Sequence, residues 1–383
     1  MESTDVLVIG SGIAGLCAAI EAARAGATVA IACAGKTMSG SSFFPGTWGL
    51  GLIGPVDKDD EQDLIDTIQT VGGGVADPEL VQTFVHGIPQ AIDWLEQDLG
   101  VELQRPQSAE SAQQKQFIPC FDHKTRMWRG LTRKPLEDAC TAQIDSLGIR
   151  LLPRHELIDL VEDTNGKIVG AVLFNQTDER IVTFTAKATI IAAGGTGGLF
   201  ERSLTSADVL SSSQAIARSH GASLTNIEFM QMMPGFIEPK RNLVFNEKTW
   251  RYVKFDQPVD IADVKLDDLL EQRSGYGPFT SRLASRAIDL AIDQAGAEGW
   301  RSTTTSRERM SPSSCRHLPL GYKTSMVSLR ATRYVWRCMP TPLTAVSRST
   351  GRVHGREGLY AVARQQAACT APTASEGCRA PMA

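Results

Sequence analysis

Three glycines near the N-terminus have the spacing of a site for nucleotide phosphates. Gly10, Gly12 and Gly15 form a G-x-G-x-x-G motif, with Ser11 and Ala14 among the intervening residues. In such a motif the first glycine makes a tight turn, the second lets the backbone approach a pyrophosphate, and the third lets a helix pack closely on a strand. The free N–H groups and partial positive charge of the helix N-terminus favour the phosphates. The motif therefore predicts dinucleotide binding.

The segments that flank this motif have the patterns needed to position it. An apolar run from Val6 to Ile9 predicts a buried parallel strand, and apolar residues at helical spacing follow the motif as far as Gly26. A second strand is predicted from Thr28 to Ala32. Because strand, glycine motif, helix and strand come in the required order, ligand binding is favoured over a glycine-rich turn without a ligand.

The second predicted strand departs from the dinucleotide pattern at its end. An acid there normally holds a ribose hydroxyl, but the sequence is Ala32-Cys33-Ala34. Ribose recognition must therefore come from another segment or from polar backbone groups. The loop that follows, residues 35–49, mixes serines and glycines with aromatic residues. Since aromatic side chains are costly to expose, we expect this loop to pack on a ring system, with a flexible surface loop as the alternative.

The composition is that of an ordinary globular protein. The chain has 383 residues, 42% of them hydrophobic, and a net charge of −4, which gives room for two domains. The slightly acidic balance argues against a nucleic-acid partner. The eight cysteines have neither zinc nor haem spacing, so we expect no metal site. No apolar run is long enough to span a bilayer and the acidic N-terminus is unlike a signal peptide, so we expect a cytoplasmic protein.

Alternating patterns farther along the chain predict an antiparallel meander. Amphipathic helices are predicted first, over residues 60–71, 78–99 and 136–147. Strand patterns follow at residues 158–161, 167–174 and 180–185, with a tight turn at Asn165-Gly166. An apolar strand then returns at residues 188–193 and ends in a glycine cluster, Gly194 to Gly198. Open α/β sheets bind ligands at such strand ends.

The order of these motifs resembles the FAD-dependent fumarate reductase, succinate dehydrogenase and L-aspartate oxidase flavoproteins. The resemblance extends over roughly residues 5–300, and its matching segments are residues 5–16, 40–44, 189–198, 220–234 and 277–289. It implies an α/β fold with a Rossmann-like FAD-binding domain over residues 1–224. An antiparallel β-meander is inserted at about residues 150–187, and a partial α+β substrate-capping domain covers residues 225–300.

The resemblance also implies a cofactor and its contacts. FAD is expected to be held non-covalently, because the loop at residues 40–44 lacks the histidine that bonds to the flavin in membrane-bound succinate dehydrogenases. The implied reaction moves a hydride between FAD and a carbon beside a carboxylate of a small-molecule substrate. The implied cofactor contacts are Gly10, Ser11, Gly12, Ala14, Gly15, Ser41, Ser42, Phe43, Ala193, Gly194 and Gly195.

On the substrate side, the implied proton donor is Arg282. It stands one position out of register with the family's PRDxxxRAI pattern, and a solvated helix charge is the alternative. Met233 stands where the family's EFxQxHP pattern has a substrate-binding histidine, a role that a thioether cannot take. Glu228 and Gln231 are expected to shape the pocket. The sequence leaves open which carboxylate is the substrate and what the electron partner is.

The last part of the chain differs in composition from the rest. Residues 301–383 contain thirteen Lys plus Arg, three acids, and no Asp, Asn, Ile or Phe. A disordered basic tail that binds polyanions is one interpretation. Our hypothesis is instead a shifted reading frame. Codons for residues 301–350 can be chosen so that another frame contains HASNGGISID, which resembles the family's substrate-histidine segment.

The family's pattern returns in the written frame at Glu357–Val362 and is lost again from Ala363, where a further shift can restore it. We therefore predict that residues 301–383 are poorly ordered and that the chain has little or no activity. Other classes stay open: an NAD(P)H-dependent flavin reductase, a non-catalytic flavin-binding protein, and a nucleotide-binding module without redox chemistry. The first would need a second G-x-G-x-x-G after a strand, and Gly194 to Gly198 opens no good helix pattern.

Overall fold

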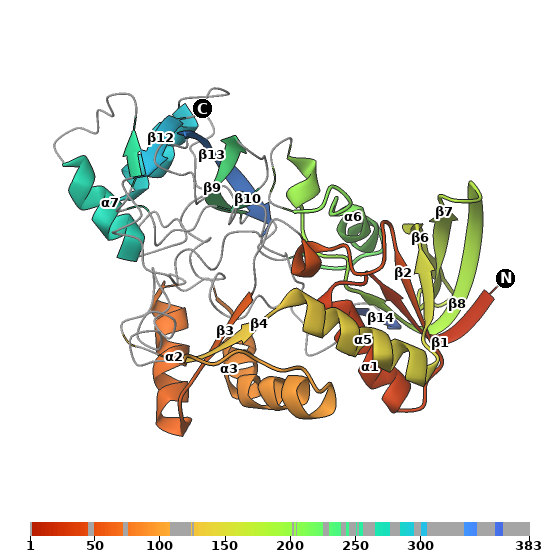
Figure 1. The fold of residues 1–383 in the computed structure, drawn as a ribbon. Coiled ribbons are helices and arrows are strands. Elements are labelled where there is room, and N and C mark those ends of the chain that lie inside the picture. Colours follow the sequence, from red (N-terminus) through yellow and green to blue (C-terminus); the bar gives the residue numbers. More distant parts are fainter. Residues whose placement is uncertain are drawn as a thin grey trace.

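A seven-stranded sheet built around the N-terminal strand organises the structure, which is a computed structural model (Figure 1). The strand order is β5-β2-β1-β8-β7-β6, and β14 also pairs with β8. The structure describes residues 2–44, 50–71, 76–107, 124, 126–200, 203, 205–224, 230–238, 243–244, 250, 253–255, 265–275, 284–294, 300–304, 333–342 and 357–362.

Five strands of this sheet run parallel to one another. Val8 of the first strand is level with Ile31 of the second and with Ile190 of the eighth. Every residue of β2 is buried, as expected for a parallel strand that is covered on both faces. The Rossmann-like α/β fold is therefore confirmed. The parallel strands are β1 (Glu2–Ile9), β2 (Val29–Cys33), β5 (Arg150–Pro153), β8 (Arg180–Ile191) and β14 (Leu359–Ala361).

The predicted antiparallel meander is present, but it continues the same sheet. β6 (His155–Glu162) pairs with β7 (Ile168–Asn175), and β7 pairs with β8. The sequence predicted separate strands at residues 180–185 and 188–193, whereas β8 runs through Arg180–Ile191 without a break. No glycine or proline interrupts that stretch, so the last meander strand leads directly into the parallel part.

Two helices cover one face of the parallel strands. α1 (Ile13–Arg24) and α5 (Arg133–Leu147) lie next to each other there (Figure 1). Leu16 of α1 and Leu136 of α5 are buried in one apolar core with Val8 of β1. This packing holds the N-terminus of α1 at the end of β1, where the glycine motif lies.

On the other face of the parallel strands lies α6 (Ser212–Ser219), and the meander strand β6, although part of the same sheet, also contacts β2. His220, at the end of α6, ties this helix to β6. Its Nδ1 lies 2.6 Å from Oε1 of Glu162, and its Nε2 lies 2.8 Å from Oδ1 of Asp159. Burial lowers the pKa of His220, but the hydrogen bonds to the two carboxylates outweigh it and hold the pKa above its ordinary value of 6.5.

A helical pair and a short two-stranded sheet lie beside this core. α2 (Lys58–Val71) contacts α3 (Pro78–Asp93), and α3 contacts the first strand of the small sheet. The predicted helix over residues 78–99 is α-helical only to Asp93 and continues as the π-helical turn η2 (Trp94–Asp98). Among the helices that the structure describes, none has the length and apolar character to cross a membrane. The small sheet pairs β3 (Leu50–Gly54) with β4 (Met127–Leu131).

A second unit is built on a five-stranded antiparallel sheet with the order β10-β9-β13-β12-β11 (Figure 1). Trp250, Ile288 and Ile292 are buried in its apolar core. Inside this unit the buried Arg273 donates hydrogen bonds from Nε and Nη2 to the Asp289 carboxylate, at 3.2 and 3.3 Å. Its elements are β9 (Met230–Glu238), β10 (Leu243–Val244), β11 (Val253–Phe255), β12 (Trp300–Thr304), β13 (Arg333–Pro342), α7 (Leu266–Gly275) and α8 (Arg286–Gln294).

Parts of the compositionally unusual region, residues 301–383, are strands in the structure. β13 pairs with β9, and β14 adds to the main sheet beside β8. Around β14, Thr189 N donates to Gly358 O at 2.9 Å, and Lys167 Nζ lies 2.8 Å from the Glu357 carboxylate. β14 belongs to the Glu357–Val362 segment in which the family's pattern returns. The shifted-frame hypothesis remains a prediction.

Candidate functional site

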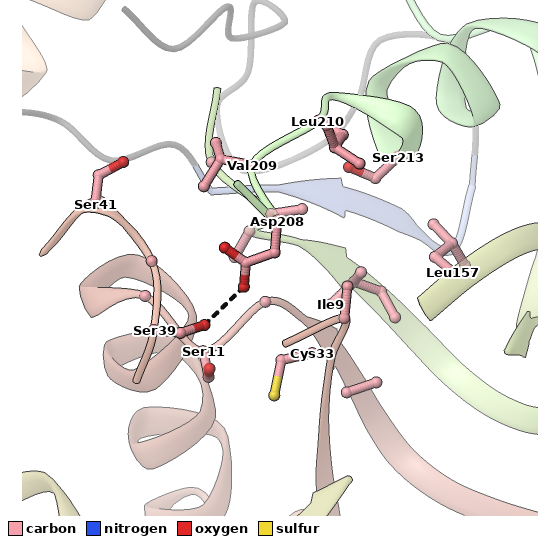
Figure 2. A pocket seen from close by; sticks show the side chains of 18 of the residues that line it. Ile9, Ser11, Cys33, Ser39, Ser41, Leu157, Asp208, Val209, Leu210 and Ser213 are labelled. Atoms are coloured by element: carbon pink, nitrogen blue, oxygen red, sulfur yellow. Dashed lines mark hydrogen bonds between the residues drawn. The ribbon is translucent and has the colours of Figure 1, made fainter. Parts of the chain in front are cut away.

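A groove opens at the carboxyl ends of the parallel strands. The ends of β1, β2 and β8 line it together with the N-termini of α1 and α6 and the start of β6 (Figure 2). Counting the space that opens to solvent, it encloses about 950 Å³. This is the edge at which open α/β sheets bind their ligands.

Segments that are far apart in the sequence meet in this groove. Of the predicted cofactor contacts, all but Gly15 and Phe43 line it. The predicted contacts that line the groove are Gly10, Ser11, Gly12, Ala14, Ser41, Ser42, Ala193, Gly194 and Gly195. The glycine motif, the serine loop and the second glycine cluster therefore line the same groove.

The three motif glycines have different surroundings. Gly10 has a φ of +113°, and a Cβ on it would lie 2.3 Å from Ala192 O. A Cβ on Gly15 would lie 2.0 Å from Gly10 O, so this residue permits the close approach of helix to strand. A Cβ on Gly12 would meet only Ser42 Oγ, at 3.9 Å. Gly10 and Gly15 are thus required by the packing of the chain itself, whereas Gly12 leaves space open to the groove.

The loop after β2 is fastened to the glycine motif by its serines. Met38 N donates to Ser11 Oγ at 3.0 Å, and Ile13 N donates to Ser42 Oγ at 3.4 Å. The short 3₁₀ turn η1 (Ser41–Phe43) carries this contact. Phe43 is only 3% exposed and belongs to the apolar core with α1. Its side chain does not line the groove, so the structure gives it a packing position.

Several groove residues were missed by the sequence analysis. They come from the start of β6 and from the segment before α6, and they include His155, Glu156, Asp208 and Ser213. Gln214 Nε2 donates to Gly194 O at 3.0 Å, which fixes α6 against the second glycine cluster. The missing acid after β2 indicated that ribose recognition comes from another segment or from polar backbone groups, but the sequence did not indicate which.

Two carboxylates, Glu156 and Asp208, line the groove, and Gln176 Nε2 donates to Glu156 Oε2 at 3.3 Å. Ser39 Oγ donates to Asp208 Oδ2 at 2.8 Å, whereas the buried Asp208 Oδ1 has no hydrogen-bond partner among the described residues. Neither Lys nor Arg is among the described residues that line the groove. The charge of a bound phosphate would therefore be met by the N–H groups and the dipole at the start of α1.

The substrate-side predictions fall largely outside the described residues. Arg282 and Glu228 lie outside them. Gln231 and Met233 are on β9, paired with Thr341 and Met339 of β13.

Comparison with known proteins identifies L-aspartate oxidases and fumarate reductases among the relatives of this chain. The chain is 34% identical over 248 residues to the L-aspartate oxidase of Halobacterium salinarum, covering 61% of this chain and 45% of that protein. It is 27% identical over 234 residues to the fumarate reductase flavoprotein subunit of Escherichia coli, covering 60% of this chain and 38% of that protein. The chain spans about half the length of the curated relatives it matches.

Solved structures have the same fold. A mutant form of the Escherichia coli quinol fumarate reductase superposes with a TM-score of 0.70 at 17% identity, over 96% of this chain and 66% of that one. A Mycobacterium smegmatis Sdh1 complex gives a TM-score of 0.69 at 21% identity, over 94% and 62%. The predicted resemblance is confirmed.

The groove itself is suited to FAD. The open space at Gly12 admits a pyrophosphate, and the start of α1 supplies N–H groups for it. The buried, unpartnered oxygen of Asp208 is an acceptor that the described residues leave for a ligand. FAD is accordingly the cofactor. Since the FAD binding domain family matches residues 5–246, which is more than half of the chain, the protein belongs to that family.

Proposed function

We propose that this chain is the flavin-binding part of an FAD-dependent oxidoreductase that acts on a carboxylate-bearing small molecule. The observation that carries the proposal is the convergence of three separate motifs on one groove. Bound FAD would supply hydride transfer. The chain's own residues would hold the cofactor and exclude water from it.

Each wall of the groove has a task in this proposal. The backbone from Gly10 to Ile13 would hold the pyrophosphate, with Gly12 leaving the space for it. Ser41 and Ser42 would contact the cofactor from the loop, and residues 193–195 from the opposite strand end. Since residues 35–49 contain no histidine, cysteine or tyrosine, we infer that this loop forms no covalent bond to the flavin.

The substrate side rests on the resemblance and the relatives. Arg282 is our candidate for the proton donor, and Glu228 and Gln231 for residues that shape the substrate pocket. A dicarboxylate such as fumarate, succinate or aspartate is the substrate class that the relatives' names support. The electron partner is open, and a cytoplasmic location remains a prediction.

The test of cofactor binding is purification of the full chain and analysis of its flavin. We expect a yellow protein that releases FAD into the supernatant on acid denaturation, as a non-covalent complex does. Gly12→Ala should raise the Kd for FAD about tenfold or more without unfolding the chain, because it fills the space for the pyrophosphate. Gly87→Ala, where a Cβ meets nothing within 4 Å, is the matched control. A colourless wild-type chain that does not take up added FAD would refute the proposal.

A second candidate is a non-catalytic flavin-binding protein, which the methionine at position 233 favours. The two candidates differ in the fate of the reduced flavin. Chemically reduced protein that is reoxidised by fumarate under anaerobic conditions supports the oxidoreductase. Bound FAD that stays reduced when fumarate or iminoaspartate is added supports the binding protein.

A further inference from the structure

The groove needs an acceptor for the ribose of the adenosine half, and β2 does not supply it. The strand ends Ala32-Cys33-Ala34, where the dinucleotide fold usually places an acid. Cys33 cannot replace that acid. Its Sγ lies 3.7 Å from Gly35 O and 3.9 Å from Leu152 O, as a thiol that donates, and burial raises its pKa, so the side chain stays neutral.

A carboxylate from a remote part of the chain reaches the same place. Asp208 precedes α6, and Figure 2 shows its side chain directed at Ser39, beside Cys33. Ser39 Oγ donates to Asp208 Oδ2 at 2.8 Å. Gly35 makes this approach possible, because a Cβ on Gly35 would lie 2.1 Å from the same oxygen. The carboxylate is therefore held at the carboxyl end of β2.

The second oxygen of this carboxylate is left for a ligand. Asp208 Oδ1 is buried and has no hydrogen-bond partner among the described residues. A buried acceptor without a donor destabilises a protein, so native proteins rarely leave one. No Lys or Arg among the described groove residues is placed to pair with it. A donor that arrives with the ligand resolves this, and the sugar of a dinucleotide carries hydroxyl donors.

We propose that Asp208 is the ribose acceptor of this site: its Oδ1 accepts a hydrogen bond from a hydroxyl of the adenosine ribose of FAD. The inference rests on the proposed function. It assigns the role of the missing β2 acid to a residue on a different segment, held in place by Ser39 and by the absence of a side chain at Gly35.

A purely structural role is the competing explanation, since the Ser39–Asp208 hydrogen bond also joins the loop after β2 to the segment before α6. The two roles predict different ligand dependence. A ribose acceptor discriminates between FAD and an analogue that lacks one ribose hydroxyl. A structural tie affects both ligands equally.

The experiment measures the Kd of the flavin-free full chain by quenching of flavin fluorescence. The ligands are FAD and its analogues with 2′-deoxyadenosine or 3′-deoxyadenosine, and the variants are Asp208→Ala, Asp208→Asn and Ser39→Ala. We expect the wild type to bind FAD about tenfold or more tightly than one of the deoxy analogues, because a hydrogen bond to a charged group is lost. Asp208→Ala should abolish that preference, and Ser39→Ala should reduce it, because the hydrogen bond that holds the carboxylate is lost.

The outcomes separate this inference from the proposed function. Equal affinity of the wild type for FAD and both analogues overturns the role of Asp208, and so does an Asp208→Ala chain that keeps the preference. Equal weakening of all three ligands assigns Asp208 to structure alone. If Asp208→Ala does not fold, a preference reduced in Asp208→Asn supports the inference, and an unchanged one overturns it. A wild type that binds no flavin refutes the proposed function itself.

Discussion

Gly15→Ala tests whether the glycine motif is a packing requirement as well as a ligand site. A Cβ at this position would lie 2.0 Å from Gly10 O and 3.2 Å from Ala192 Cβ. The first contact is with backbone, which cannot rotate away, so α1 must move off β1 to accept the methyl group. Leu16 and Ile20 of α1, both fully buried, would be displaced from their core.

The size of the effect follows from comparison with a second helical glycine. Gly87 lies in α3, and a Cβ there meets nothing within 4 Å. Both substitutions gain about 1 kcal/mol of helix propensity. Only Gly15→Ala introduces a methyl group into a filled core, which costs about 3 kcal/mol at the upper end of overpacking effects. We therefore expect Gly15→Ala to be about 3 kcal/mol less stable than Gly87→Ala.

The assay is urea unfolding of both variants without added flavin, followed by far-ultraviolet circular dichroism. Flavin is left out because a ligand stabilises whichever variant binds it better. Equal midpoints for Gly15→Ala and Gly87→Ala would refute the reasoning. That result would mean that α1 can move away from β1 at no cost, and that Gly15 is needed for the ligand alone.

Four further predictions follow from the structure. The raised pKa of His220 makes its link to β6 strongest below about pH 6.5, so the thermal stability of the wild type should fall as the pH rises from that value. This fall should be absent in His220→Gln, and the Tm of both chains measured at several pH values checks this. Phe43→Leu should lower the urea midpoint and leave the Kd for FAD unchanged, since the side chain lies in the core. Asp289→Asn should destabilise the second unit by about 3 kcal/mol, measured by urea unfolding, whereas Asp293→Asn on the exposed side of the same helix should not. Sequencing of the gene should show HASNGG in another frame near the codons for residues 340–350, and its absence there would end the shifted-frame hypothesis.

The sequence determined the parts of this protein that depend on local pattern. The apolar run before Gly10, the helical spacing after Gly15 and the turn at Asn165-Gly166 each act over a few residues. They predicted β1, α1 and the hairpin of the meander, and the structure confirms them. Because an α/β sheet brings the carboxyl ends of its parallel strands to one edge, the meeting of the glycine motif and residues 193–195 could also be predicted.

Two features were decided only by the tertiary structure, because they depend on groups that are far apart in the chain. The pattern around Phe43 fits a cofactor contact or a core position, and the packing of α1 against the loop puts it in the core. The lack of an acid after β2 is visible in the sequence, but Asp208 reaches that position only because β8, the second glycine cluster and α6 bring it there. Local pattern fixes the elements, whereas the partner of a buried polar atom is chosen by the whole fold.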